Sequence, residues 1–441
     1  RRQFVPAEAW HWPPLPRPDI KAEERGRLVL NAFPEVVPFE IRAAIYSQQL
    51  DEIVAANAGN SFFPQGGVTL RVRRTHVYED AMMQFQTAFA GLRRSQMRSL
   101  LKRRVRVTFI DQHGRIEAGI DAGGLFKEFV DVLGKRIFDP SYGFFSTTPS
   151  GQLYPSPQAH IVDPESFEEH FTFMGQMLGL AMFNRISVEP IFANFFLKRL
   201  LGIDGEIDDL HSLDPEQYTH VMTLFNASPE EVEDADLHFE VDTLTLGGSE
   251  TKSLLRNASG GDIRVTADNV AVYAMKLAKF KLNEEIDRPC KAFLRGLRML
   301  ISEEMLSMFS PHELQTLISG SNKPLDLGDL RRNCVVRNNN FNEARKQEYM
   351  KWFWDVVRDL DVEQQQNLLR FVTSCPRQPL LGFASLQPLF GIQLLGANAD
   401  TKLPMAGTCM NLLKLPVYST KQLLRDKLIL AISANAGFEM S

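Results

Sequence analysis

One cysteine of this chain lies in a setting that could present a nucleophile. Cys409 follows Leu403-Pro404 and a run of small residues, and it precedes an apolar run that ends at Pro416. A proline followed by small residues predicts a tight, exposed turn, and the apolar run predicts a strand. Ser419-Thr420 then predict the N-cap of an amphipathic helix. A thiol on such a turn, braced by a strand and a helix, is placed as a catalytic nucleophile would be.

An inert role is the alternative for Cys409, because free cysteine is among the most often buried residue types. The other cysteines are Cys290, Cys334 and Cys375, and no cysteines or histidines have the spacing of metal ligands. We therefore expect no zinc site and no other metal. Few and widely separated cysteines favour free thiols in a reducing compartment, so the cytoplasm or the nucleus is the expected location.

The composition argues against several other classes of protein. With 441 residues, 44% of them apolar and 23% charged, the chain is long enough for two or three folded domains. Its 54 acidic and 49 basic side chains give a net charge of −5, which argues against a dedicated nucleic-acid binder. The apolar stretches are too short to cross a bilayer, and Arg1-Arg2-Gln3 does not open a signal peptide. Neither nucleic acid nor a membrane is therefore an expected partner.

The pattern of apolar residues changes along the chain and predicts more than one domain. A helix is predicted where apolar residues recur every three or four positions, at Phe39, Ala43, Tyr46, Leu50 and Ile53. Alternation predicts strands over 68–73 and 105–110, and the pattern is then mostly helical as far as Gly320. Beyond it we expect two helices, over 347–360 and 362–371, followed by short strands. A domain boundary near Gly320 follows.

A glycine-rich string over 119–129 invites comparison with a phosphate-binding loop. It fits neither GxGxxG nor GxxxxGK[ST], the two spacings that cradle phosphates. A tight loop that leads into a helix, with Asp121 as the N-cap, is the favoured interpretation.

The segment from Leu403 to Pro416 resembles the active-site segment of HECT-type ubiquitin ligases, where the cysteine follows a Leu-Pro, small-residue and threonine pattern. Ten other blocks also resemble the family, and they occur along the chain in the family's order. These blocks are Arg73-Arg74 with Glu79-Asp80-Ala81, Gly119 to Phe129, Gly143-Phe144-Phe145 with Leu153-Tyr154-Pro155, Gly175 to Ala181, Ser212 to Pro215, Val265-Thr266 with Asn269, Ala292-Phe293 with Gly296, Phe353-Trp354, Phe371 to Ser374, and Pro379 to Phe383. The resemblance covers about residues 70–441. The Cys-Met-Asn-Leu-Leu-Lys-Leu-Pro variant and the extension before residue 70 resemble most the subgroup that works with the proteasome and lengthens polyubiquitin chains.

Two positions depart from the family's pattern. Met405-Ala406-Gly407 is less polar than the usual approach to the cysteine, so no side-chain donor precedes Thr408. Asn339-Asn340-Phe341 stands where the family commonly has Gly-Gly-Tyr, and asparagine tolerates a left-handed backbone well enough to keep a turn there.

The resemblance implies an α+β fold in which two lobes are joined by a flexible hinge. A short extension over 1–70, proline-rich and then helical, would precede a large, mainly helical N-lobe over 71–322. The hinge is expected over 323–329, and a smaller α/β C-lobe that carries the catalytic cysteine is expected over 330–441. Within the N-lobe, a subdomain at about 190–290 would bind a ubiquitin-conjugating enzyme.

The resemblance also assigns chemistry to three residues. Cys409, preceded by Thr408, would accept ubiquitin as a thioester and pass it to a lysine of a substrate or of another ubiquitin. Phe438, the fourth residue from the C-terminus, would support the transfer to lysine. No cofactor is expected, since exchanging one thioester for another needs neither nucleotide nor metal. The implied partners are ubiquitin, a conjugating enzyme, protein substrates and the proteasome.

The same resemblance places an apolar groove for the conjugating enzyme on the subdomain. Its expected lining residues are Val221, Leu224, Phe225, Leu237, Tyr273 and Leu277. Their three- and four-residue spacing also fits plain core packing, and the sequence leaves both interpretations open. Two other functions remain as alternatives. A thiol hydrolase acting on ubiquitin would need a nucleophile, a base and an orienting group, whereas an inactive scaffold would keep only the HECT fold.

Overall fold

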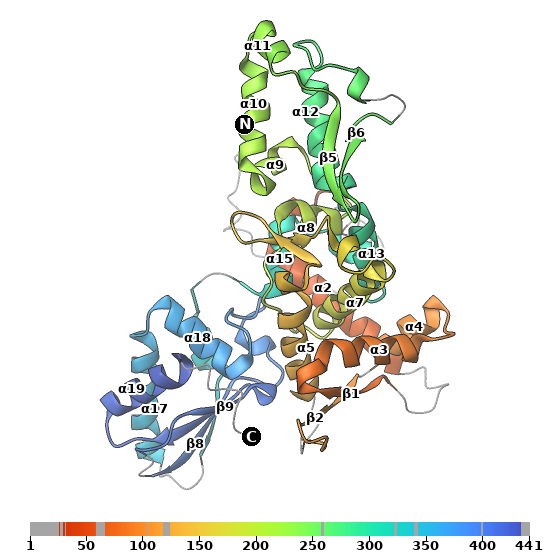
Figure 1. Ribbon diagram of the computed structural model, residues 1–441. Helices are drawn as coiled ribbons and strands as arrows, with labels where there is room; N and C mark the ends of the chain where they lie inside the picture. The colour runs from red at the N-terminus through yellow and green to blue at the C-terminus, as the bar shows by residue number, and fades with distance from the viewer. Residues whose placement is uncertain are drawn as a thin grey trace.

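The computed structural model describes residues 26, 30, 32–58, 67–103, 105–117, 124–256, 260–321, 324–338, 343–397 and 400–433. Its buried apolar side chains form three separate cores. The largest extends from Tyr46 to Ile318, a second extends from Leu330 to Ile432, and a third, from Val221 to Phe280, lies within the span of the first. Figure 1 shows the corresponding N-lobe, C-lobe and projecting subdomain. The α+β, two-lobed fold that the resemblance implies is confirmed.

The N-lobe is mainly helical and contains two small two-stranded sheets. Its elements are η2 (Pro34–Val36), α2 (Phe39–Ala58), β1 (Thr69–Arg73), η3 (Arg74–His76), α3 (Val77–Phe89), α4 (Arg94–Leu101), β2 (Arg106–Ile110), α5 (Gly124–Ile137), η4 (Pro140–Tyr142), β3 (Phe145–Thr147), β4 (Leu153–Pro155), α6 (Ala159–Val162), α7 (Phe167–Phe183), α8 (Asn194–Leu200), α13 (Asp287–Leu297), α14 (Glu303–Leu306) and α15 (Pro311–Ser319). Strand β1 pairs in parallel with β2, and β3 pairs antiparallel with β4. The predicted strands over 68–73 and 105–110 are therefore confirmed.

Two glycines allow the central helices α7 and α13 to approach closely. A methyl group added at Gly296 would lie 2.0 Å from the carbonyl oxygen of Thr172 on α7. One added at Gly175 would lie 2.0 Å from the carbonyl oxygen of Phe293 on α13. Because both distances are far below van der Waals contact, any side chain at either position would force the helices apart. This crossing gives a physical reason for glycine in two of the blocks that resemble the family.

Helix α2, predicted from its apolar spacing, packs on the core of the N-lobe. Tyr46 is 6% exposed, and its ring meets that of Phe309 edge to face at 6.0 Å. Arg42, 5% exposed, donates two hydrogen bonds to the carboxylate of Glu313 on α15, at 2.6 and 2.9 Å. A bidentate pair of this kind combines charge with fixed geometry. It ties α2 to α15, the last helix of the N-lobe before the C-lobe.

The subdomain consists of helices around an antiparallel hairpin. Its elements are α9 (Ile207–Leu213), α10 (Pro215–Asn226), α11 (Pro229–Asp234), β5 (Glu240–Thr245), β6 (Gly248–Ser253), η5 (Gly260–Asp262), α12 (Val270–Lys279) and the wider turn η6 (Phe280–Glu284). Asp214 caps α10, since its carboxylate accepts from the backbone N–H of Gln217 at 2.9 Å, and Pro215 occupies the first turn. The first backbone N–H groups of a helix have no partner within the helix. Asp214 accepts from one of them, and Pro215 has no N–H that would need a partner.

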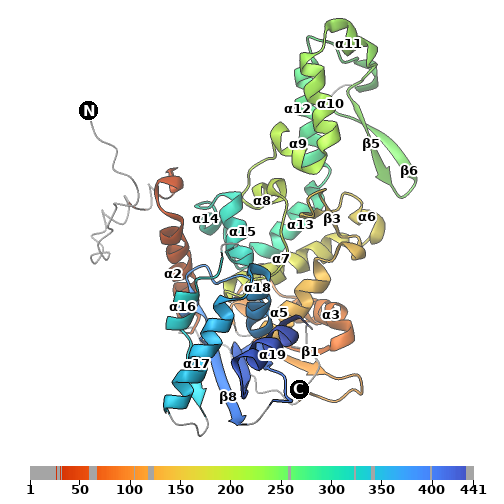
Figure 2. The ribbon, with the colours of Figure 1, turned by 90° about the vertical axis from the view of Figure 1, so that its left-hand side faces the viewer.

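The C-lobe is an α/β unit with one four-stranded sheet. Its elements are α16 (Leu327–Arg332), β7 (Val335–Asn338), α17 (Glu343–Arg358), α18 (Val362–Thr373), η7 (Phe383–Ser385), β8 (Gly391–Ala397), β9 (Met405–Gly407), η8 (Thr408–Met410), β10 (Leu412–Val417) and α19 (Lys421–Ser433). The strand order is β7-β8-β10-β9, with β9 antiparallel and the other neighbours parallel. The two helices predicted beyond Gly320 correspond to α17 and α18. Figures 1 and 2 place this lobe at the opposite end of the molecule from α10 and α11.

Candidate active site

Cys409 lies in η8, a single short turn that joins the edge strand β9 to the inner strand β10. The sequence predicts that a tight, exposed turn follows Pro404 and leads into the strand, but the turn begins only at Thr408. Residues 405–407 instead form β9, in which Gly407 faces Leu412 and Met405 faces Lys414 across an antiparallel pair. Tertiary pairing decides the difference, because the neighbouring apolar strand offers the free backbone groups of this segment hydrogen-bond partners. The chain therefore turns at the cysteine itself.

The buried side chain of Asn411 holds this turn in place. Asn411 has a left-handed backbone (φ 48°), and its N–H donates to the carbonyl oxygen of Thr408 at 3.2 Å. Its side-chain amide donates to the carbonyl oxygen of Pro388 at 2.6 Å, while its own carbonyl oxygen accepts from the N–H of Gly391 at 2.8 Å. Asparagine adopts this backbone more readily than most residues. Its position two residues after Cys409, inside an apolar run, is the sequence signal of this buried, left-handed residue.

Elements of both lobes surround the cysteine turn. Helix α5 of the N-lobe and helix α18 of the C-lobe both pack against η8. From α5, the Nζ atom of Lys127 donates to the side-chain oxygen of Asn411 at 2.6 Å. Thr408, the residue before the cysteine, is 9% exposed and accepts the Asn411 N–H through its backbone. A cation and a buried amide thus lie next to the backbone of the turn that carries the thiol.

The other three cysteines are poorly suited to nucleophilic attack. Cys290 is fully buried on α13, and burial raises the pKa of its thiol to about 12. Burial also raises the pKa of Cys334 to about 12, and it raises the pKa of Cys375 from its ordinary value. Because the thiolate is the reactive form, these thiols stay protonated and unreactive at neutral pH. Cys409 remains the candidate nucleophile.

The structure distributes the six expected groove residues between a core and a surface. Val221, Leu224, Tyr273 and Leu277 are at most 6% exposed and belong to the core of the subdomain, as the core-packing interpretation requires. Leu237 packs partly against the same core, and the side chain of Phe225 is 39% exposed. Two apolar residues that sequence reasoning missed are also exposed on α12, Val272 at 42% and Met275 at 58%. Tyr273 and Ala274 between them are buried, so the two exposed residues lie on the outward face of α12.

Several expected features fall outside the described residues. Phe438 lies there, as do Asp121, the first part of the glycine-rich string and the Asn339-Asn340-Phe341 segment. The helix that this string was expected to feed is α5, described from Gly124 onward. Within the described ranges, no group of three or more histidine, cysteine or acidic side chains could hold a metal ion. In the same ranges, no helix combines the length and the apolar character needed to span a bilayer.

A two-lobed α+β chain with a cysteine turn at the sheet edge of its smaller lobe has the architecture expected of a HECT domain. The sequence model of the family described as HECT-domain (ubiquitin-transferase) matches residues 131–441. The chain therefore belongs to the HECT family of ubiquitin-transferases.

Known ubiquitin ligases are similar to the chain well beyond the catalytic segment. The E3 ubiquitin-protein ligase UPL6 of Arabidopsis thaliana is 38% identical over 422 residues, which cover 95% of this chain and 39% of that protein. Ubiquitin-protein ligase E3B of Mus musculus is 34% identical over 481 positions, covering 100% of this chain and 43% of E3B. The E3 ubiquitin-protein ligase HUL5 of Saccharomyces cerevisiae is 34% identical, covering 94% of this chain and 45% of HUL5. The chain thus spans about two fifths of the length of these relatives.

Proposed function

We propose that this chain is the catalytic part of a ubiquitin-protein ligase that carries ubiquitin as a thioester on Cys409. The observation that supports this most directly is the position of Cys409. It lies on a turn contacted by elements of both lobes, whereas burial keeps the thiols of Cys290, Cys334 and Cys375 protonated. Membership of the HECT family supplies the reaction type.

The proposed reaction has two steps. The Cys409 thiolate attacks the carbonyl carbon of the thioester between ubiquitin and the conjugating enzyme, and the carbon–sulfur bond to that enzyme's cysteine breaks. A lysine amine then attacks the new thioester, loses a proton and forms an amide, while Cys409 leaves as the thiolate. The first step exchanges equivalent bonds and the second is downhill, so no cofactor is required. Positioning, rather than a strongly activated thiol, supplies much of the rate.

Incubation with a conjugating enzyme loaded with ubiquitin distinguishes this proposal from its alternatives. A ligase gains a ubiquitin adduct that reductant removes, and it then modifies lysines. A thiol hydrolase releases free ubiquitin without a lasting adduct, and an inactive scaffold produces neither result. If the chain only releases ubiquitin, it is a thiol hydrolase and the ligase proposal is wrong. If it forms no adduct and releases no ubiquitin, it is an inactive scaffold.

We propose the outward face of α10 and α12 as the surface that receives the conjugating enzyme. Phe225 is the exposed member of the expected groove, with Leu237 partly accessible, while Val221, Leu224, Tyr273 and Leu277 would shape the surface from beneath. Apolar anchors at the centre of an interface commonly contribute about 2 kcal/mol, which corresponds to about thirtyfold in affinity.

Phe225→Ala is therefore expected to raise the concentration of loaded conjugating enzyme needed for half-maximal charging by about tenfold or more. The rate of the lysine step from preformed thioester should stay unchanged. Met83→Ala, at an apolar side chain on α3 that is more exposed than Phe225 (58% against 39%), is the control. Single-turnover charging over a concentration series makes the comparison, and equal charging curves for both variants would place the docking surface elsewhere.

We propose that Phe438 acts after thioester formation. Removal of its ring, as in Phe438→Ala, is expected to leave the Cys409 adduct intact and to slow transfer to lysine by about tenfold or more. We expect this size of effect because the loss of one contact that positions the reacting groups commonly slows a reaction by such a factor. Pulse-chase measurement of charging and of discharge separates the two steps. Loss of both steps to the same extent would show instead that Phe438 only supports folding.

We further propose that the ligase extends polyubiquitin chains on protein substrates, works with the proteasome, and acts in the cytoplasm or the nucleus. The resemblance of the Cys409 segment to the chain-extending subgroup supports these assignments. Mass spectrometry of the products would test chain extension, because single ubiquitin on every substrate lysine would contradict it. Co-purification with proteasomes and imaging of the full protein would test the other two.

A further inference from the structure

A part-buried hydrogen bond links the cysteine turn to the N-lobe. Lys127 and Asn411 are separated by 284 positions in the sequence, yet the ammonium nitrogen of one lies 2.6 Å from the side-chain oxygen of the other. Asn411 is 1% exposed and also holds the turn against Pro388 and Gly391. A shift of the Asn411 side chain would therefore also shift the backbone of the turn that carries Cys409. Displacement of Lys127 would remove this hydrogen bond between the turn and α5.

A cavity and an exposed ion pair also lie at the boundary between the lobes. A cavity of about 190 Å³ lies there, lined by Met182 and Leu317 from the N-lobe and by Leu369 from the C-lobe, with Lys127 and Asn411 at its wall. The Arg370–Glu189 ion pair also crosses the boundary at 3.0 Å, but its side chains are 42% and 34% exposed. Exposed ion pairs contribute little because water screens them. The shielded Lys127–Asn411 contact is thus the stronger of these two polar links.

The docked cysteine turn lies far from the proposed site for the conjugating enzyme. Figures 1 and 2 both show α10 and α11 at one end of the molecule, and α5 with the C-lobe at the other. Charging at the subdomain therefore requires the C-lobe to leave α5. Discharge to lysine has no such requirement, because the attacking lysine need not bind α10 or α12.

We propose that Lys127 is a positioning residue for the lysine step, which it serves by holding the Cys409 turn on α5 through Asn411. This inference rests on the proposed function, and it adds a second role for the N-lobe beyond receiving the conjugating enzyme. A cation that donates to a shielded amide can hold the turn in one geometry, and attack on a thioester is sensitive to such geometry. The contact opens for charging and forms again before discharge.

Lys127→Met keeps the length of the side chain and removes the donor. It is expected to slow discharge of preformed Cys409 thioester onto free lysine by about tenfold. One hydrogen bond to a charged group can change the population of the docked turn by about this factor. Charging should proceed at the wild-type rate or faster, because the docked state no longer competes with it. Lys127→Arg keeps a donor and should recover at least part of the discharge rate.

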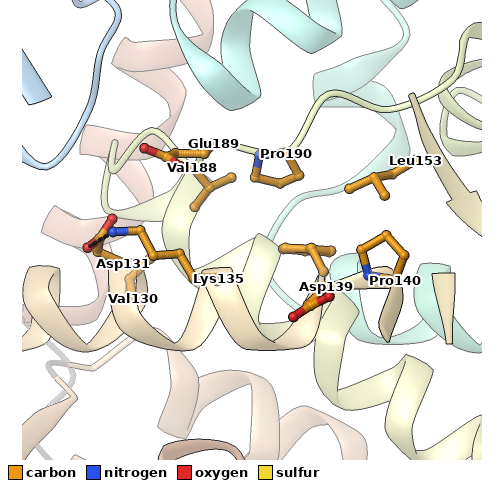
Figure 3. Close-up of a pocket in the computed structure, with 11 residues that line it drawn as sticks. Val130, Asp131, Lys135, Asp139, Pro140, Leu153, Val188, Glu189 and Pro190 are labelled. Atoms are coloured by element: carbon orange, nitrogen blue, oxygen red, sulfur yellow. Dashed lines mark hydrogen bonds and ion pairs between the residues drawn. The ribbon is translucent and has the colours of Figure 1, made fainter. Parts of the chain in front are cut away.

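Lys135→Met is the matched control on the same helix. Figure 3 shows Lys135 extended along α5 toward Asp131, whose carboxylate it meets at 3.0 Å within the N-lobe. Loss of this amine removes a similar charge from α5 without touching Asn411. It should change neither step, and thermal unfolding of every variant would identify a general loss of fold.

A double-variant comparison tests whether Lys127 acts through Asn411. Asn411→Gly removes the side chain while keeping a residue that readily adopts the left-handed backbone. It should slow discharge at least as much as Lys127→Met, and adding Lys127→Met to it should slow discharge no further. Independent, multiplying effects would overturn the proposed linkage.

The outcomes of the pulse-chase experiment are separable. Slower discharge with charging retained supports the positioning role. Faster charging with unchanged discharge would show that the contact merely stabilises a resting state, and equal loss of both steps would show a structural role; either result overturns the proposal. Failure of the wild-type chain to form any Cys409 adduct would instead defeat the proposed function itself.

Discussion

Cys409→Ser is expected to convert a ubiquitin adduct that reductant removes into one that reductant leaves intact. A serine hydroxyl can form an oxygen ester, and thiol reductants cleave thioesters but not oxygen esters. The hydroxyl is also far less ionised and less nucleophilic than a thiol at neutral pH. The variant adduct should therefore accumulate slowly, and transfer to lysine should fall by about a thousandfold or more, as for removal of a catalytic nucleophile.

The measurement is gel electrophoresis of the adduct with and without reductant after incubation with loaded conjugating enzyme. Cys334→Ala provides the control, because Cys334 also lies in the C-lobe but its thiol is kept protonated by burial. This control should charge and discharge like the wild type. A reductant-sensitive adduct that persists in Cys409→Ser would assign the thioester to another cysteine, and the proposed mechanism would be wrong at its first step.

Gly296→Ala is expected to have the largest effect on stability. The added methyl carbon would lie 2.0 Å from the carbonyl oxygen of Thr172 and 2.6 Å from the backbone nitrogen of Gln176. Both obstacles are backbone atoms of α7, so the contact cannot be relieved by rotating a side chain. The two helices must separate, which opens space in the core of the N-lobe. We expect a loss of about 4 kcal/mol or more in the free energy of unfolding.

Gly134→Ala on α5 is the matched control for this substitution. It also lies within a helix, but beyond the adjoining residues and the nearby backbone of α5 a methyl group there would meet nothing within 4 Å. Since alanine is the better helix former by about 1 kcal/mol, the control should stabilise the chain slightly. Denaturant unfolding of both variants makes the comparison. Similar unfolding midpoints for Gly296→Ala and the wild type would contradict the close approach of α7 and α13.

Local features of the fold could be predicted because neighbouring residues decide them. Asp214 and Pro215 open α10 as their types require, and the apolar spacing around Ala43 and Tyr46 produces the buried face of α2. Predictions failed or stayed open where burial depended on distant segments. The segment over 405–407 is a strand because β10 lies beside it. Likewise, helical spacing could not show that Val221 faces the subdomain core while Phe225 faces outward.

The sequence by itself determined the candidate nucleophile, the succession of helices and strands, and the family, because these depend on residue types at short spacing. Only the tertiary structure decided what surrounds the Cys409 turn. The contact between Lys127 and Asn411, and the one between Gly296 and Thr172, join residues that no periodic pattern connects. Such contacts depend on how whole elements pack, where a shift of one ångström makes or breaks a hydrogen bond. The physical basis we propose for holding the thioester during transfer is therefore a property of the folded chain.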